Sequence, residues 1–327
     1  RASVDLAWVT ECQVHPAVET DDIDLSDRRK QCQAIVRLAG RIQRIESRLA
    51  EAVPQFSHAE QLLDWYVHGG HHMLELEAAR SLHDWHECAD EKLHLAAGEY
   101  LLGGDDELSP ASGSLVGRVR KHLDALDLIL SKFIGASPDK FAIGPRSFVS
   151  FIKHELGDGL QPILTGDSDG RVWVLIFDGM RYDTWEAVVQ PLLGEHFQIS
   201  GQPRFCTLPS YTLYARRSVL AGGPPSAWAT GKNAASRPEP QLLAENVGLA
   251  KHEVKDKVRL VTDADTTKAR TAMTFKDTHV KPLNVLIYPI SDDCHDYRGD
   301  LASFNSKIRQ DMVGDRNTGI RGILDDL

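Results

Sequence analysis

An uninterrupted apolar run, VWVLIF, extends from residue 172 to residue 177 and ends at Asp178. Because no polar residue alternates with the apolar ones, the run is typical of a strand buried on both faces of a parallel sheet. Further strands are predicted at 198–206, 258–261 and 284–290. Helical patterns separate these strands, so we predict an α/β domain with a mainly parallel sheet. The helical segments are 183–193, 212–220, 241–250, 301–312 and 319–324.

The chain before this domain has helical spacing and turn signals but no strand pattern. Between residues 27 and 53, apolar residues recur at steps of three and four, which places them on one face of a long helix. A linker rich in Gly, Asp and Ser follows at 166–170. We therefore expect an all-α region over 1–165 and the α/β domain over 166–327. The other expected helices are 58–68, 72–89, 90–102, 115–135 and 147–156.

A basic stripe lies beside the apolar face of the long helix, formed by Arg37, Arg41, Arg44 and Arg48. It could dock a nucleic acid or an acidic partner, or it could be the solvated flank of a packed helix. We favour the solvated flank, because charge runs on helices usually face water.

Six histidines crowd two neighbouring helical segments, and their spacings of three and four could place two imidazoles on one face. No carboxylate or cysteine pair completes a tetrahedral set at a recognisable spacing. We interpret these histidines as surface and boundary residues and predict no metal there. They are His68, His71, His72, His83, His86 and His94.

The composition limits the classes of partner. A formal net charge of −10 argues against attraction of nucleic acid by net charge alone, so a polyanionic substrate needs a local basic patch or a bound metal. No apolar stretch approaches the roughly 20 residues of a membrane span, and we predict no membrane partner. The five cysteines form no CxxC pair, which argues against a disulfide framework and favours the cytoplasm.

Carboxylates follow two of the predicted strands. Asp178 ends the first strand, whereas Asp292, Asp293 and His295 follow the strand 284–290. Carboxyl ends of parallel strands share one edge of the sheet, so these side chains could converge on divalent cations. An Asp at a strand end can also simply cap the following turn, and Asp178 alone does not separate the two interpretations.

The segment RFCTLPSYTLYARRSVLAGG adds hydroxyl groups at the start of a predicted helix, namely Ser210 and Thr212. Free N–H groups and the helix dipole favour a phosphoryl group there. A hydroxyl at that place can act as a nucleophile once a metal lowers its pKa. Ser210 could instead be an N-cap, and both roles are compatible if Ser210 caps and Thr212 attacks.

The order of these elements resembles the alkaline phosphatase superfamily. Within it, FDGMRYDTWE, TLPSYTLYARRSVLAGG and NVLIYPISDDCHDYRGDLASFN resemble the PglZ family, which occurs in BREX phage-defence systems. The resemblance covers 171–327 and, loosely, the helical region around LLDWYVHGGHHMLELEAAR. It implies an alkaline-phosphatase-like fold, of which 166–327 would form the N-terminal half.

The resemblance also implies roles for individual residues. Thr212 stands ten residues before Gly222, the register of the family's nucleophile, with Ser210 as the alternative. Asp178 would bind one metal together with Thr212. Asp292 or Asp293, with His295, would bind the second metal, although the spacing from Asp292 to His295 is three where the superfamily has four. The substitutes for these ligands are Asp296 and Asp300.

The implied activity is metal-dependent hydrolysis of phosphoesters or phosphodiesters, nuclease activity included, with two zinc or manganese ions and a phosphothreonine intermediate. The implied partners are a phosphoester or nucleic-acid substrate and other proteins of a defence complex. No Asp-His-Gly motif, which completes the first metal site in the family, occurs in the 327 residues. We therefore expect either part of a longer protein or a member with degraded chemistry. The alternative function is a catalytically inactive scaffold or docking subunit.

Overall fold

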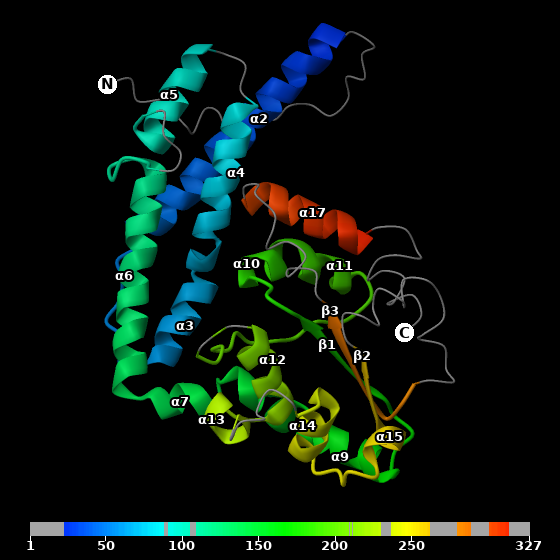
Figure 1. The fold of residues 1–327 in the computed structure, drawn as a ribbon. Helices are drawn as coiled ribbons and strands as arrows, with labels where there is room; N and C mark the ends of the chain where they lie inside the picture. Colours follow the sequence, from blue (N-terminus) through cyan, green and yellow to red (C-terminus); the bar gives the residue numbers. More distant parts are fainter. Residues whose placement is uncertain are drawn as a thin grey trace. The chain divides into compact units, whose positions relative to one another are not determined.

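The computed structural model describes residues 23–87, 91–104, 109–208, 210, 212–229, 237–261, 280–288 and 301–313. The chain forms two compact units, which Figure 1 colours along the sequence. The helical unit comprises Arg1–Phe133 with Gly299–Ser303, and the sheet unit comprises Ile134–Arg298 with Phe304–Leu327. The compact sheet unit therefore begins earlier than the domain boundary expected at residue 165.

The helical unit is organised around the predicted long helix. Ala34, Leu38, Ile42 and Ile45 are buried along one face of this helix and pack on the neighbouring helices, as the apolar spacing predicted. A short 3-10 turn, η1 (His71–Met73), joins α3 to α4. The helices are α2 (Ile23–Ala50), α3 (Ala59–His68), α4 (Leu74–His86), α5 (Glu91–Leu102) and α6 (Leu115–Ala136).

Three arginines of the α2 stripe pair with buried carboxylates of α4. Arg37 and Arg44 remain exposed, as expected for the flank of a packed helix, but their ion pairs were not predicted. Arg37 Nε and Arg41 Nε donate to the Asp84 carboxylate at 3.0 and 2.7 Å, and Arg44 Nη2 donates to Glu77 Oε2 at 2.9 Å. The side chains of Asp84 and Glu77 are 4% and 9% exposed. Acidic groups this far from water need charged partners, and the stripe supplies them across the α2–α4 contact.

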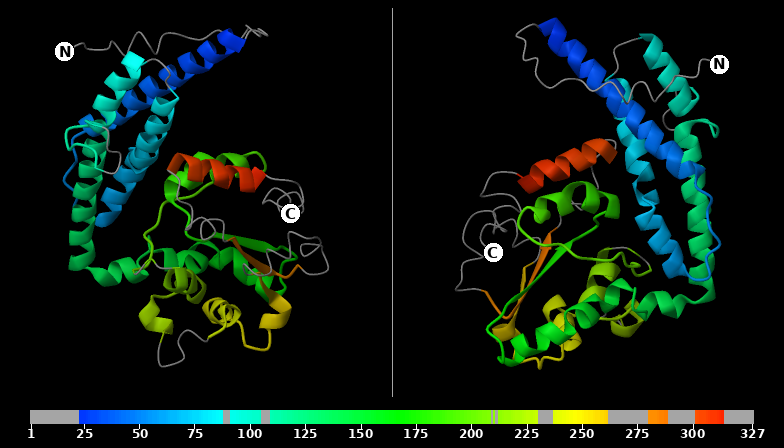
Figure 2. Two further views of the ribbon diagram at one scale, coloured as in Figure 1. Left: turned by 45° about the horizontal axis from the view of Figure 1, so that its top comes forward. Right: turned by 180° about the vertical axis from the view of Figure 1, so that it is seen from behind.

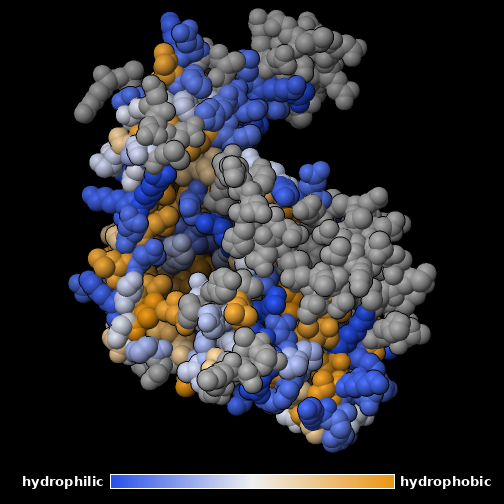
Figure 3. Space-filling model, viewed as in Figure 1, coloured by the Kyte–Doolittle hydropathy of each residue, from blue (hydrophilic) through white to orange (hydrophobic). Residues whose placement is uncertain are grey.

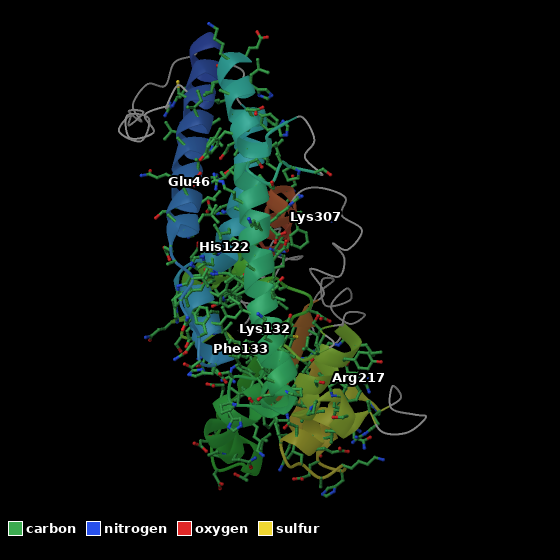
Figure 4. All side chains as sticks on the ribbon, turned by 90° about the vertical axis from the view of Figure 1, so that its left-hand side faces the viewer. Glu46, His122, Lys132, Phe133, Arg217 and Lys307 are labelled. Carbon is green, nitrogen blue, oxygen red and sulfur yellow. The ribbon has the colours of Figure 1, made fainter. Side chains whose placement is uncertain are left out.

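Two of the six clustered histidines are buried, contrary to the expectation of surface and boundary positions. His71 is fully buried and stacks on Trp65 with ring centroids 3.8 Å apart. Its Nδ1 lies 3.2 Å from Nε2 of His122, which α6 supplies and Figure 4 labels. His72 is also buried. The spacing of the histidines gave no sign of this packing, because Trp65 and His122 come from other helices.

The sheet unit contains the predicted parallel sheet. Its strands are β1 (Val172–Phe177), β2 (Val258–Val261) and β3 (Leu283–Tyr288), arranged in the order β1-β3-β2 with both pairs parallel. The central strand β3 is almost completely buried from Leu283 to Ile287, whereas most β1 side chains are half-buried. The α/β fold class is confirmed, and the continuous apolar runs reflect helices on both faces of the sheet.

Helices cover both faces of the sheet, as Figures 1 and 2 show. Val174, Val285 and Ile287 pack on one face against α9 (Gly157–Thr165), α12 (Thr212–Ala221) and α14 (Glu239–Asn246). On the other face, Phe177 joins a cluster formed by the helices after β1 and by Ile308. These helices are α10 (Tyr182–Thr184), a π-helical turn (Trp185–Val189), α11 (Gln190–Gly194) and α17 (Leu301–Val313).

The strand predicted at 198–206 is wrong. Phe205 makes an isolated parallel bridge with Ser147, in which Phe148 N donates to Phe205 O at 2.8 Å, and the residues from 198 to 204 are irregular. Pro203 has no N–H to donate to a ladder, which disfavours a strand there. The helix predicted at 319–324 lies outside the described residues. The remaining short helices are α7 (Pro138–Ile143), η2 (Phe148–Ser150), α8 (Phe151–Glu155), α13 (Pro225–Trp228) and α15 (Val254–Lys257).

Figure 3 shows patches of hydrophobic residues interspersed with hydrophilic ones over the face that it draws. Large apolar residues that are exposed include Leu95, Leu128 and Ile143, each more than half exposed. Over the ranges that the structure describes, no helix combines the length and apolar character that a membrane crossing requires.

Candidate active site at the carboxyl edge of the sheet

Asp178 follows the last residue of β1 at the carboxyl edge of the sheet and is 7% exposed. The next residue, Gly179, has φ +68°, a left-handed conformation that lets the chain turn sharply after the strand. Phe177 pairs with Tyr288 of β3, so β1 and β3 end at the same level of the sheet. Tyr288, the last residue of β3, therefore lies at the same edge of the sheet as Asp178.

The other predicted metal ligands follow β3 in the sequence and lie outside the described residues. They are Asp292, Asp293 and His295, with the substitutes Asp296 and Asp300. Their roles stay predictions, which the common level of the two strand ends supports.

Thr212 is the first residue of α12, as predicted, although its side chain falls outside the described part. Ser210 is exposed and lies two positions before the helix. The helix ends before Gly222, which has φ +69°, and a Cβ there would come within 2.0 Å of Asn246 Oδ1. Gly223 N donates to Ser218 O at 3.2 Å and closes the last turn. The glycine at this position is thus required by both backbone conformation and packing.

An ion-pair network joins Asp178 to α12 and α14. Arg216 Nη1 donates to Asp178 Oδ2 at 3.1 Å, and Arg216 Nε donates to Glu239 Oε1 at 3.0 Å. The side chains of Asp178, Arg216 and Glu239 are 7%, 19% and 10% exposed. Arg216 follows Thr212 by four positions and therefore lies on the same face of α12, one turn further along.

Sequence reasoning missed Arg216 and Glu239. The step of four from Thr212 to Arg216 is a signal that could have identified the arginine, since it places both residues on one helix face. Glu239 has no comparable signal, because it lies 23 positions from Arg216 and reaches it only through the packing of α14 on α12.

The adjacent Arg217 differs from Arg216 in its surroundings. It is 6% exposed, it donates through Nη2 to the carbonyl of Arg237, and its guanidinium lies 5.3 Å from the ring centroid of Trp228. Trp228 Nε1 in turn donates to Ser218 Oγ at 3.0 Å. Arg217, labelled in Figure 4, thus packs α12 against α13, whereas Arg216 contacts the strand end.

A second buried carboxylate, Asp183, lies in the turn after β1 and is 2% exposed. Its partners are local: Arg181 Nη2 donates to it at 2.8 Å and the backbone N–H of Thr184 at 2.7 Å. These contacts hold the first turn of the helix after β1. The partners of Asp183 are thus its sequence neighbours, whereas Asp178 pairs with an arginine of α12.

The donor groups at this edge suit a divalent cation in chemical type. Asp178 and Glu239 both direct carboxylate oxygens at one guanidinium, and carboxylate oxygens are ligands for zinc and manganese. Within the described ranges, no group of three or more His, Cys, Asp or Glu side chains could hold a metal ion. The other predicted ligands follow β3 in the sequence, and their role stays a prediction.

Comparison with known protein families identifies the same part of the chain. Residues 157–234 match the family model described as the BREX system PglZ alkaline phosphatase-like domain. The matched segment contains β1, Asp178 and α12, so the resemblance drawn from the sequence motifs is confirmed there. A search of curated proteins finds no match.

Proposed function

From the BREX-type PglZ alkaline phosphatase-like domain at residues 157–234, we propose that the protein is a metal-dependent phosphoesterase of bacterial anti-phage defence. Its proposed substrates are phosphodiesters, in nucleic acid or in nucleotides. The observation that carries the proposal is the buried Asp178 at the carboxyl edge of the sheet, ion-paired to the helix that begins with Thr212. Active sites of open parallel sheets occur at this edge.

Thr212 is the proposed nucleophile. Its hydroxyl oxygen attacks phosphorus and loses its proton, the bond from phosphorus to the ester oxygen breaks, and the departing alcohol takes up a proton. Water then attacks the phosphothreonine, which releases the hydrolysed phosphate product and restores the hydroxyl. The N–H groups of the first turn of α12 bind the phosphoryl oxygens and stabilise their charge.

Asp178, and Asp292 or Asp293 with His295, are the residues proposed to hold divalent cations. Zinc or manganese bound there would neutralise phosphoryl charge and lower the pKa of the attacking hydroxyl. Asp178 contributes a carboxylate whose position is already fixed by Arg216.

The functional division proposed for the chain is a helical region over 1–165 and half of a PglZ domain over 166–327. We assign the helical region to docking on other defence-complex proteins and the cytoplasm as the place of action. The defence-system context of this assignment rests on the family description of residues 157–234.

The test compares Thr212→Ala with Ser210→Ala in a protein that contains the complete domain. Thr212→Ala should abolish hydrolysis of a chromogenic phosphodiester while metal content and melting temperature stay near those of the wild type. The lost hydroxyl costs at most about one cap interaction, about 1 kcal/mol. An inactive Ser210→Ala beside an active Thr212→Ala would identify Ser210 as the nucleophile. If both variants retain phage defence in cells, the scaffold function is correct.

A further inference from the structure

The guanidinium of Arg216 bridges two carboxylates through different nitrogens. Nη1 contacts Asp178, and Nε contacts Glu239. These two contacts are independent, because a guanidinium can lose its partner at one edge while its Nε–H keeps the other. Glu239, at the start of α14, therefore anchors Arg216 whether or not Asp178 is engaged.

The position of Arg216 on α12 brings it to the nucleophile. Side chains of an α-helix lean toward its N-terminus, so a residue covers the turn before its own. Arg216 follows Thr212 by four positions, so both residues lie on one face of α12, one turn apart. A phosphoryl group at the Thr212 hydroxyl would thus lie on the side of α12 from which Arg216 reaches Asp178.

We propose that Arg216 alternates between two anions: the Asp178 carboxylate when no cation is bound, and the phosphoryl group of the substrate when a cation has taken Asp178. The proposal rests on the proposed function, and it assigns Arg216 as a phosphoryl-binding residue and Glu239 as its positioning residue. Neither role follows from the sequence motifs.

Charge explains the exchange. A divalent cation on Asp178 repels the guanidinium that shares the carboxylate, and the contact through Nη1 weakens. Arg216 remains on Glu239, and its two Nη groups then offer the fork that matches two phosphoryl oxygens. Binding of the cation and binding of the phosphoryl group consequently promote each other, because each favours the same arrangement of Arg216.

The exchange can be tested without metal. Asp178→Asn removes the negative charge that holds Arg216, as a bound cation would, and leaves the size of the side chain unchanged. In a metal-free buffer, this variant should bind inorganic phosphate about tenfold more tightly than the wild type, measured by calorimetry. Adding Arg216→Gln to Asp178→Asn should remove the whole gain.

Arg237→Gln is the matched control. It breaks the ion pair between Arg237 and Glu245, which lies in the same unit but does not involve Asp178. It should leave phosphate affinity unchanged. Equal phosphate affinities of Asp178→Asn and the wild type would overturn the proposal, and so would a gain that survives Arg216→Gln. Circular dichroism checks the fold of each variant.

A second measurement covers the case in which Asp178→Asn does not fold. Manganese should increase the phosphate affinity of the wild type, and Arg216→Gln should cancel this increase while it tightens the binding of manganese itself. A merely structural Arg216 would weaken both affinities together, which would overturn the proposal. If Asp178→Asn folds and the wild type binds no manganese, the proposed function fails, whereas the metal-free comparison still decides the role of Arg216.

Discussion

The helical unit and the sheet unit each contain a network of arginines and buried carboxylates. In the helical unit, Arg41 contacts both Asp84 and Glu77 in the middle of the α2–α4 contact. In the sheet unit, Arg216 contacts Asp178 and Glu239 where a strand ends and two helices begin. The chemical groups are the same, but only the second network lies at the edge where open parallel sheets bind ligands.

This difference separates stability from chemistry. Charged groups between two helices hold one arrangement of the chain, and loss of a partner leaves buried charge uncompensated. At the sheet edge, the proposed role of the Asp178 carboxylate is to exchange its arginine for a cation. We therefore expect substitutions in the first network to change folding and substitutions in the second to change binding and turnover.

The largest expected effect is that of Asp178→Ala on hydrolysis. Loss of the proposed negative metal ligand should lower turnover of a phosphodiester at least about a thousandfold, about 4 kcal/mol in activation free energy. Metal content should fall in parallel, while Glu239 continues to hold Arg216 and the melting temperature changes little. Inductively coupled plasma spectrometry measures the metal content, and calorimetry measures the melting temperature. Full turnover in Asp178→Ala would show that the network of the sheet unit is not needed for hydrolysis.

Asp84→Ala should destabilise the helical unit by about 3 kcal/mol, because it removes the carboxylate that Arg37 and Arg41 both contact. Hydrogen exchange of α2 and α4 in increasing urea measures this loss. Asp127→Ala, an exposed position on α6, is the control and should stay within about 0.5 kcal/mol of the wild type. A destabilised sheet unit beside an intact helical unit would contradict the assignment.

The pH dependence of stability should also differ between the units. Burial lowers the pKa of His122, and burial together with the charge of His122 lowers the pKa of His71, while Glu51 opposes this effect and Arg48 adds to it. The unfolded chain, whose histidines titrate near about 6.5, then binds more protons than the folded one. Stability is therefore present above that pH and is lost as the pH falls.

Hydrogen exchange of the helical unit at about pH 7.5 and about pH 5 measures this loss. His122→Gln should reduce the difference between the two conditions, and His196→Gln, at an exposed position of the sheet unit, should not. An equal response of wild type and His122→Gln would show that other groups cause the pH dependence.

Ser210→Ala should have the smallest effect. The residue is exposed and precedes α12 by two positions, so we expect stability within about 0.5 kcal/mol of the wild type and only a modest decrease in turnover. Thermal unfolding and phosphodiester hydrolysis measure these values. A loss as large as that of Asp178→Ala would place the nucleophile at Ser210.

Periodicity in the sequence predicted the helices and strands that are determined by residues close together in the chain. The buried face of α2, the three parallel strands and the start of α12 at Thr212 all follow from apolar spacing and turn signals. The strand predicted at 198–206 is absent. Pro203 has no N–H to donate to a ladder, and Phe205 pairs only through an isolated bridge to Ser147.

The paired charges depend on contacts distant in the sequence, so periodicity does not reveal them. Asp84 lies 43 positions from Arg41, and Glu239 lies 23 positions from Arg216. The ion pairs of the α2 stripe were consequently not predicted, and two of the three residues in the candidate site's ion network, Arg216 and Glu239, were missed. Asp178, in contrast, was identified because the end of a buried strand is a local feature.

The most direct test of the proposed chemistry is to trap the covalent intermediate. A protein containing the complete domain is mixed with a phosphodiester substrate in the presence of manganese, quenched in acid and digested for mass spectrometry. The account predicts a phosphoryl adduct on Thr212 that is absent from Thr212→Ala and reduced in Asp178→Ala. Turnover without any adduct at Thr212, or an adduct at Ser210 in its place, would contradict it.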